Sequence, residues 1–339
     1  MPDTEILSPS QRIRGVLAPA VTPFKADLSP DRERFIKHCQ WLISQNCGLA
    51  PFGTTSEANS MSKNERTSLL DALGAAGIDP LRMMPGTGCC SITETVELTA
   101  QAVKHGCAGV LILPPFYYKD VSEEGLYWYF SEVVQRVGDA RLRIYLYHIP
   151  PVAIVGITPR LVERLLKAYP NAIAGMKDSS GDWNNTKTFL DAFAESGFDV
   201  FVGSETFLLA NMCNGGAGTI SATANVNPAA IYEVYAECSR NQTSEIRSAD
   251  GRIRRGEHRT PALEAQQAGL NVVRDVFSSR KFASMIAAIK QAIAIYANDP
   301  EWARARPPLV ELTTEQAKLL AAELKRIGFA MTGMSNTES

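Results

Sequence analysis

The residue best suited to covalent chemistry in this chain is Lys177. It follows an apolar run, residues 172–176, and precedes Asp178 and two serines. This pattern is typical of a short buried strand that ends in a lysine, with a loop behind it. An amine in an apolar pocket is more easily kept neutral than one in water, and a neutral amine can attack a carbonyl carbon to form a Schiff base. The alternative is a structural lysine that reaches solvent or pairs with Asp178.

Tyr147 ends a second predicted strand, residues 143–147, and its phenol could donate or accept a proton near Lys177. Successive side chains of a strand point to opposite faces, so we interpret the next residue, His148, as packing behind the site. The four histidines show no H-x-H or H-E-x-x-H spacing, which disfavours a metal-dependent aldolase. They are His38, His105, His148 and His258.

Three further strand ends carry small or polar residues. Residues 53–57 (GTTSE) combine a glycine turn with the hydroxyls of Thr54 and Thr55, and their free backbone amides could bind a carboxylate. We interpret Glu57, near a helix start, as a cap or a structural hydrogen-bonding group rather than a base. The other two ends are Gly203-Ser204-Glu205 and Ile220-Ser221.

The elements that must position these residues alternate along the chain. We expect strands at residues 16–21, 48–52, 82–86, 109–113, 143–147, 173–177, 200–203 and 218–221. We expect helices between them at residues 31–45, 63–74, 92–104, 123–137, 158–168, 183–195 and 206–212, several opening on caps such as Ser62, Ser91, Ser122 and Thr158. This order predicts an α/β fold, a (β/α)8 TIM barrel over residues 15–227, in which the strand ends share one face. An open doubly wound sheet is the alternative, but no G-x-G-x-x-G follows a strand.

The two ends of the chain differ from this pattern. Residues 1–14 form an N-terminal extension, and residues 228–339 form a C-terminal helical region that we expect to pack on the barrel. Its helices are expected at residues 231–238, 262–277, 282–296 and 314–327, the last opening with a Thr313–Gln316 capping box. The polar, basic stretch 239–259 is interpreted as a solvated loop or helix extension, with a phosphate-binding patch as the alternative.

Composition indicates a globular protein without nucleic-acid or membrane partners. The chain has 339 residues, 45% apolar and 21% charged, and a net charge of −2. Its seven cysteines are odd in number and lack metal-like spacing, so we expect reduced, mostly buried thiols. The first ten residues lack the pattern of a signal peptide, and no apolar run is long enough to cross a bilayer. We therefore expect a cytoplasmic protein.

Together these residues resemble the dihydrodipicolinate synthase / N-acetylneuraminate lyase family of Schiff-base aldolases. The shared motifs are residues 15–24 (GVLAPAVTPF), 53–57 (GTTSE), 86–88 (GTG), 114–118 (PPFYY), 147–150 (YHIP), 175–179 (GMKDS), 215–226 (GGAGTISATANV) and 306–309 (RPPL). They occur in order through most of the chain. The resemblance implies a (β/α)8 barrel with a C-terminal helical region, commonly assembled as a homotetramer.

The resemblance also implies roles at matching positions. Lys177 matches the Schiff-base lysine, and Tyr147 matches the tyrosine that relays protons at the imine. Thr54 and Thr55 match the pair that binds the pyruvate carboxylate and links the proton relay. Tyr118 matches the aromatic relay residue that family tetramers place in a neighbour's site, with Tyr117 as the alternative. Pocket-wall positions are matched by Gly203 and Ile220.

Several departures concern the substrate. The synthase carries an arginine after its Y-x-I-P element for the second substrate's carboxylate, but residues 151–154 read PVAI. Ser56 replaces the glycine of G-T-T-G-E. Lys63, Arg66 and Cys90 stand where the lysine-inhibited synthase has two histidines and an asparagine, so we do not expect lysine feedback.

The sequence thus predicts a pyruvate-type Schiff-base lyase or aldolase that uses a 2-oxo acid and an aldehyde, with no metal or organic cofactor. Alternatives within the enzyme class are 4-hydroxy-tetrahydrodipicolinate synthase, a 4-hydroxy-2-oxoglutarate-type or sugar-acid aldolase or dehydratase, and an aromatic hydratase-aldolase. A non-catalytic 2-oxo-acid-binding barrel is the alternative from another class, and the intact Lys177, Tyr147 and Thr54 argue against it.

Overall fold

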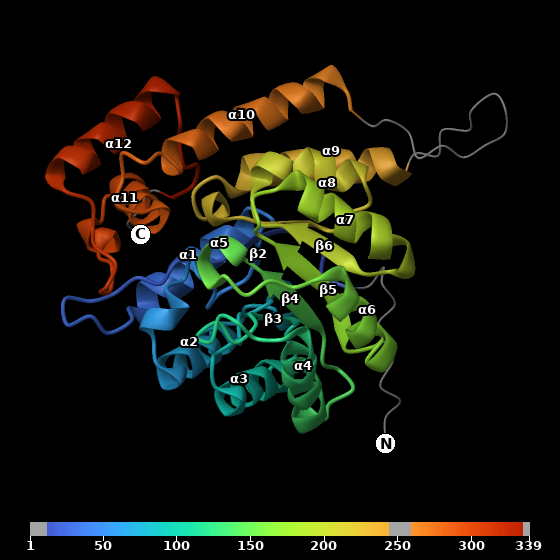
Figure 1. Cartoon of the computed structure of the whole chain (residues 1–339). Coiled ribbons are helices and arrows are strands. Elements are labelled where there is room, and N and C mark those ends of the chain that lie inside the picture. The colour runs from blue at the N-terminus through green and yellow to red at the C-terminus, as the bar shows by residue number, and fades with distance from the viewer. Residues whose placement is uncertain (1–11, 244–258, 335–339) are drawn as a thin grey trace, which may run out of the picture.

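The computed structural model describes residues 12–243 and 259–334, and its centre is a curled parallel sheet (Figure 1). The seven strands of this sheet lie in the order β2-β1-β7-β6-β5-β4-β3, and every neighbouring pair is parallel. Their bounds are β1 Gly15–Ala18, β2 Gly48–Leu49, β3 Val110–Ile112, β4 Ile144–His148, β5 Ile173–Asp178, β6 Asp199–Val202 and β7 Gly218–Ile220.

The predicted strand at residues 82–86 is wrong as a regular strand. A short 3-10 helix, η3 (Pro80–Arg82), occupies its start, and the rest makes only two isolated bridges, Leu49↔Met83 and Gly86↔Leu111. Pro85 lies between these bridges and has no N–H to donate, so a continuous ladder cannot form there. The segment still joins both edges of the sheet, because Met84 N donates to Leu49 O at 2.8 Å and Leu111 N donates to Pro85 O at 2.9 Å.

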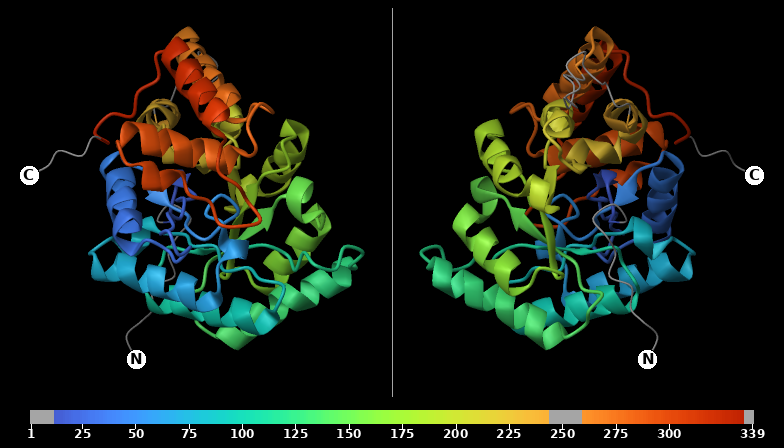
Figure 2. Two further views of the ribbon diagram at one scale, coloured as in Figure 1. Left: turned by 90° about the vertical axis from the view of Figure 1, so that its left-hand side faces the viewer. Right: turned by 90° about the vertical axis from the view of Figure 1, so that its right-hand side faces the viewer.

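Helices surround the sheet in the order that the sequence predicts (Figure 2). They are α1 Arg32–Ser44, α2 Lys63–Ala75, α3 Ile92–Lys104, α4 Glu123–Val137, α6 Pro159–Ala168, α7 Trp183–Phe193 and α8 Leu208–Cys213. The four predicted caps each accept a hydrogen bond from a backbone N–H of the first turn: Ser62, Ser91, Ser122 and Thr158. Capping of this kind satisfies amides that have no partner within the helix.

The C-terminal helices are α9 Pro228–Thr243, α10 Pro261–Phe277, α11 Met285–Tyr296 and α12 Thr314–Arg326. The predicted Thr313–Gln316 capping box opens α12. A separate apolar cluster, which includes Phe277, Ile289 and Trp302, packs α10, α11 and α12 together and reaches Val21 after β1. Most of the basic stretch 239–259 lies outside the described residues.

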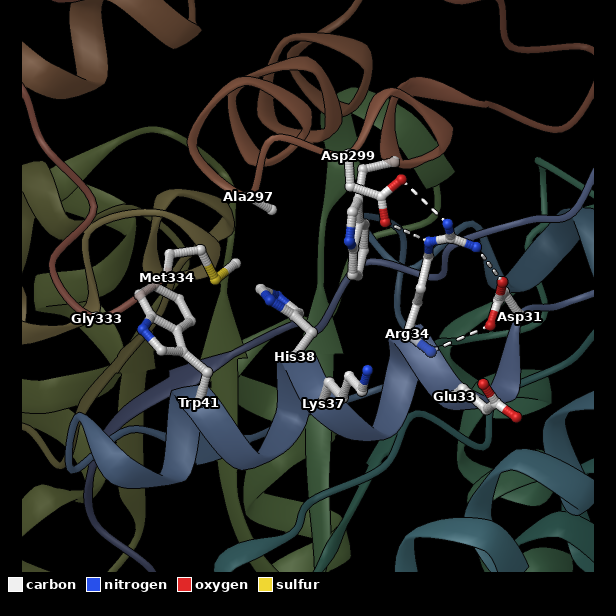
Figure 3. Close-up of a pocket in the computed structure, with 11 residues that line it drawn as sticks. Asp31, Glu33, Arg34, Lys37, His38, Trp41, Ala297, Asp299, Gly333 and Met334 are labelled. Atoms are coloured by element: carbon white, nitrogen blue, oxygen red, sulfur yellow. Dashed lines mark hydrogen bonds and ion pairs between the residues drawn. The ribbon is translucent and has the colours of Figure 1, made fainter. Parts of the chain in front are cut away.

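Between α1 and the segment after α11 lies a hollow whose rim carries an ion pair (Figure 3). Arg34 Nε of α1 lies 2.6 Å from Asp299 Oδ2, so this ion pair joins the segment after α11 to α1. None of the predicted site residues lines this hollow. Within residues 12–243 and 259–334, no helix is both long enough and apolar enough to span a membrane.

Candidate active site

Lys177 and Tyr147 lie side by side at the carboxyl ends of β5 and β4, as the sequence predicts. The two residues are partners in the strand register, and both side chains are buried. Lys177 Nζ donates to Tyr147 Oη at 3.3 Å and lies 4.3 Å from the centre of the tyrosine ring. A phenol at this distance from an amine can deliver a proton to, or take one from, a group bonded to that amine.

An irregularity in β5 decides the direction in which Lys177 points. The register pairs Ile144 with Ile173 but Tyr145 with Gly175, so Ala174 is left over as a bulge. A bulge shifts the alternation of side chains by one residue. Lys177 therefore faces the same interior as Tyr145 and Tyr147, which form an apolar cluster inside the curled sheet.

Thr54 comes to the same place from the turn after β2. Its Oγ1 lies 3.4 Å from Tyr147 Oη, so Thr54, Tyr147 and Lys177 form a line of three polar groups. The turn is held by Glu57 N donating to Thr54 O at 3.1 Å and Ala58 N donating to Gly53 O at 3.2 Å. Thr55 occupies the next position of this turn and is half-buried.

Gly203 and Ile220 lie at the ends of the neighbouring strands. Ile220 ends β7 and is fully buried in the interior cluster that also contains Tyr147. Gly203 follows β6, and its N donates to Asp178 O at 2.6 Å. A Cβ at Gly203 would come within 2.0 Å of Ser179 Oγ, so only glycine allows this close approach of the two strand ends.

Tyr117 and Tyr118 are not brought to Lys177 within the single chain. They lie on the segment between β3 and α4, where their rings contact each other edge to face with centroids 5.3 Å apart. Each is 72% exposed. The role of Tyr118, or Tyr117, in a neighbour's site therefore stays a prediction.

His148 points to the outer face of the sheet, as expected from alternation. Its Nδ1 accepts a hydrogen bond from Ile157 N at 2.9 Å, and its ring packs against Phe189 of α7. Burial lowers the pKa of His148, and the carboxylate of Asp178 opposes that shift. Its hydrogen bond and ring packing make it a structural residue.

Of the two roles expected for Glu57, the structure supports the structural hydrogen-bonding group and not the helix cap. Glu57 precedes η2 (Ala58–Ser60) without a capping bond, and instead its Oε1 accepts from Lys290 Nζ of α11 at 2.6 Å. Sequence reasoning missed Lys290. The signal that could have revealed it is a single charged residue in the run 285–296, in which all other residues except Gln291 are apolar.

The cysteines are all unpaired, as predicted, but the expectation that most are buried is wrong. Cys39, Cys47 and Cys238 are buried, Cys90 is exposed, and the other three are half-buried. In the described part of the chain, no group of three or more histidine, cysteine or acidic side chains is arranged to hold a metal ion.

Comparison with known proteins shows to which family the chain belongs. The model of the Dihydrodipicolinate synthetase family matches residues 12–327. The chain belongs to this family. The family resemblance predicted from the sequence is thereby confirmed, and with it a lyase of the class I aldolase type.

Individual members of the dihydrodipicolinate synthetase family show the same likeness. An uncharacterized DapA-like lyase of Chloroflexus aurantiacus is 31% identical over 93% of this chain and 97% of its own length. The structure of dihydrodipicolinate synthase from Agrobacterium tumefaciens is similar with a TM-score of 0.77 and 28% identity, over 93% of this chain and 99% of that one. A prophage protein of the same family from E. coli K12, solved with pyruvate, shares the fold with a TM-score of 0.80 and 23% identity, over 94% of this chain and 99% of that one.

Proposed function

We propose that this chain is a pyruvate-type Schiff-base aldolase that forms or cleaves a C–C bond of a 2-oxo acid, with Lys177 as the nucleophile. The contacts from Lys177 Nζ to Tyr147 Oη and on to Thr54 Oγ1 are the observation that carries the proposal. They put a proton-transfer group beside a buried amine in an apolar interior, which is the arrangement that imine formation needs.

The reaction begins when the neutral amine of Lys177 attacks the carbonyl carbon of the 2-oxo acid and forms a carbinolamine. Tyr147 passes a proton to the carbinolamine hydroxyl, water leaves, and an iminium remains. Loss of a proton from the neighbouring carbon gives an enamine, whose carbon attacks the carbonyl of an aldehyde while the aldehyde oxygen takes up a proton. Water then hydrolyses the new iminium and frees Lys177, and cleavage runs through the same steps in reverse.

The remaining site residues have binding roles in this proposal. The hydroxyls and amides of Thr54 and Thr55 hold the carboxylate of the 2-oxo acid, and Thr54 extends the proton path from Tyr147. Gly203 and Ile220 form the wall beside the imine. The 2-oxo acid is pyruvate, which the E. coli fold relative was solved with, and no metal or organic cofactor is needed because the iminium itself withdraws electrons.

We also propose that the sheet closes as an eight-stranded barrel over residues 15–227, with residues 228–339 as a helical region packed on it. Two observations support closure. The segment 83–87 hydrogen-bonds to both edges of the sheet. Met84 of this segment also packs in the interior apolar cluster, together with residues of the strands of the sheet. We further propose that the protein works in the cytoplasm as a homotetramer in which Tyr118 or Tyr117 completes a neighbour's site.

The test of the reaction is reductive trapping. Incubation with pyruvate and borohydride should add a pyruvate-derived mass to the peptide that contains Lys177, and Lys177→Ala should lose both the mass and the activity. The proposal fails if Lys177→Ala stays active, if the mass appears on another residue, or if a chelator abolishes activity of the wild type.

A further inference from the structure

A buried ion pair joins the turn that carries Thr54 and Thr55 to the C-terminal helices. Lys290 Nζ of α11 lies 2.6 Å from Glu57 Oε1, and both side chains are 0% exposed. The other oxygen of this carboxylate, Oε2, accepts from Arg306 N at 2.9 Å. Both oxygens of Glu57 are thus held by residues that lie more than 230 positions further along the chain.

Neighbouring side chains hold the Lys290–Glu57 ion pair in place. Lys290 Nζ lies 4.5 Å from the centre of the Phe24 ring, and the guanidinium of Arg306 lies at the same distance from that ring. The Arg306 guanidinium also donates to Ser60 O at 2.8 Å and to Glu65 Oε1 at 2.7 Å. Burial lowers the pKa of Lys290, and Glu57 opposes that shift. A buried charge of this kind is tolerated only while its partner stays in place.

Glu57 is itself part of the turn that carries Thr54 and Thr55. Glu57 has a φ of 58°, in the left-handed region that non-glycine residues rarely adopt. Backbone in this region persists where surrounding contacts hold it, and here these are the two held carboxylate oxygens. Glu57 N also donates to Thr54 O, so movement of the Glu57 backbone would move the carbonyl and hydroxyl of Thr54.

We infer that the Lys290–Glu57 pair is the positioning device for the Thr54–Thr55 turn, so that the C-terminal helices set the geometry of the 2-oxo acid site. Lys290 and Glu57 touch no reacting atom and act only through the turn. The inference rests on the proposed function, because it concerns the carboxylate-binding role of that turn. It predicts that removing the pair weakens capture of pyruvate, while Lys177 remains able to form the imine once pyruvate is saturating.

The experiment uses Glu57→Gln, Lys290→Met and the double variant, in which no buried charge is left alone. The readout is the pyruvate concentration that gives half-maximal borohydride trapping at Lys177, with circular dichroism as the check of folding. We expect this concentration to rise at least tenfold in the double variant, with the trapped fraction at saturation close to that of the wild type. The rate of aldol turnover should also fall, because Thr54 shifts relative to Tyr147.

Asp299→Asn is the matched control. It removes the negative charge from a second tie between the C-terminal helices and the barrel, the ion pair with Arg34 (Figure 3). Asparagine can still cap the short helix η7 (Pro300–Ala303). Half-maximal trapping in this variant should stay within twofold of the wild type.

Three outcomes overturn the inference. The first is a folded double variant with half-maximal trapping within twofold of the wild type, which shows that the pair only stabilises the fold. The second is an equal loss in Asp299→Asn, which shows that any weakening of the C-terminal docking has the same effect. The third is that none of the three variants of the pair folds, since the pair then supports the whole fold and not one turn. Failure of the wild type to trap pyruvate is distinct, because it removes the proposed function itself.

Discussion

At the residue scale, the site depends on three polar groups in a line, and Tyr147 is the one that both others contact. Tyr147→Phe removes one hydroxyl and almost no volume. If Tyr147 relays protons at the imine, kcat should fall by roughly 10²–10⁴-fold, the usual contribution of a positioned acid or base. The measurement is steady-state turnover with pyruvate and an aldehyde, together with a thermal melt.

Tyr145→Phe is the control for this change. Tyr145 lies on the same strand and faces the same interior, but its hydroxyl points to Asp199 at 3.4 Å. This variant should retain most of the activity. If Tyr147→Phe is within a few-fold of the wild type, the proton relay must be assigned to another group.

A second residue-scale prediction concerns His38, which packs between Trp41 and Trp302 and is buried. Burial lowers the pKa of His38 from 6.5 to about 4. Between pH 6.5 and about pH 4, the unfolded chain binds a proton at His38 that the folded chain does not. The contribution of neutral His38 to the free energy of unfolding is therefore fully present above pH 6.5 and is lost as the pH falls through this range. The loss from pH 7.5 to pH 5 should be about 2 kcal/mol.

The free energy of unfolding, measured by denaturant at both pH values, tests this. His38→Gln should lower stability at pH 7.5 but reduce the difference between the two pH values by about 2 kcal/mol. Equal pH dependence in the variant and the wild type would show that His38 does not carry this effect.

At the scale of elements, the short helix α5 (Pro150–Ala153) follows β4. The family resemblance implies that the second substrate lies against this segment. Residues 151–154 offer no cation. A carboxylate placed against this segment would lose water without gaining a partner, which costs several kcal/mol. The structure does bring one ammonium close, because Lys119 Nζ lies 3.5 Å from Ala153 O and also contacts Phe116 O.

We predict that the enzyme prefers a neutral or apolar aldehyde over aspartate semialdehyde. The comparison is kcat/KM for each with pyruvate, in the wild type and in Lys119→Met. A clear preference of the wild type for aspartate semialdehyde that disappears in Lys119→Met would make Lys119 the missing cation. That result would overturn the prediction and favour 4-hydroxy-tetrahydrodipicolinate synthase as the function.

At the scale of the whole molecule, the exposed pair Tyr117 and Tyr118 is hard to explain in an isolated chain. Two adjacent aromatic rings, each 72% exposed, form an apolar surface of the kind that marks contact sites. We predict that they pack across an interface between copies of this chain and that Tyr118 reaches a neighbour's Tyr147.

Complementation between two impaired variants of the chain tests this prediction. Tyr118→Phe and Lys177→Ala should each be impaired, and hybrids made by co-expression should regain activity, because one kind of site then has both residues intact. Tyr117→Phe, treated in the same way, decides between the two tyrosines. Hybrids verified by mass that remain inactive, or a wild type that is monomeric and fully active by sedimentation, would contradict the prediction.

The sequence by itself determined the local features of this protein. Apolar runs ending in Lys177 and Tyr147 predicted strand ends, and cap residues such as Ser62 and Ser122 predicted where helices begin, because these preferences act over a few neighbouring residues. The ordered motifs also indicated the family before the fold was known.

Only the tertiary structure decided the features that depend on distant contacts. The bulge at Ala174 sets the direction of Lys177, and its position depends on the pairing of β5 with β4. The partner of Glu57 lies 233 residues away on α11. No local preference specifies such a pair, because its energy comes from burying two charges together, and that burial exists only after the chain has folded.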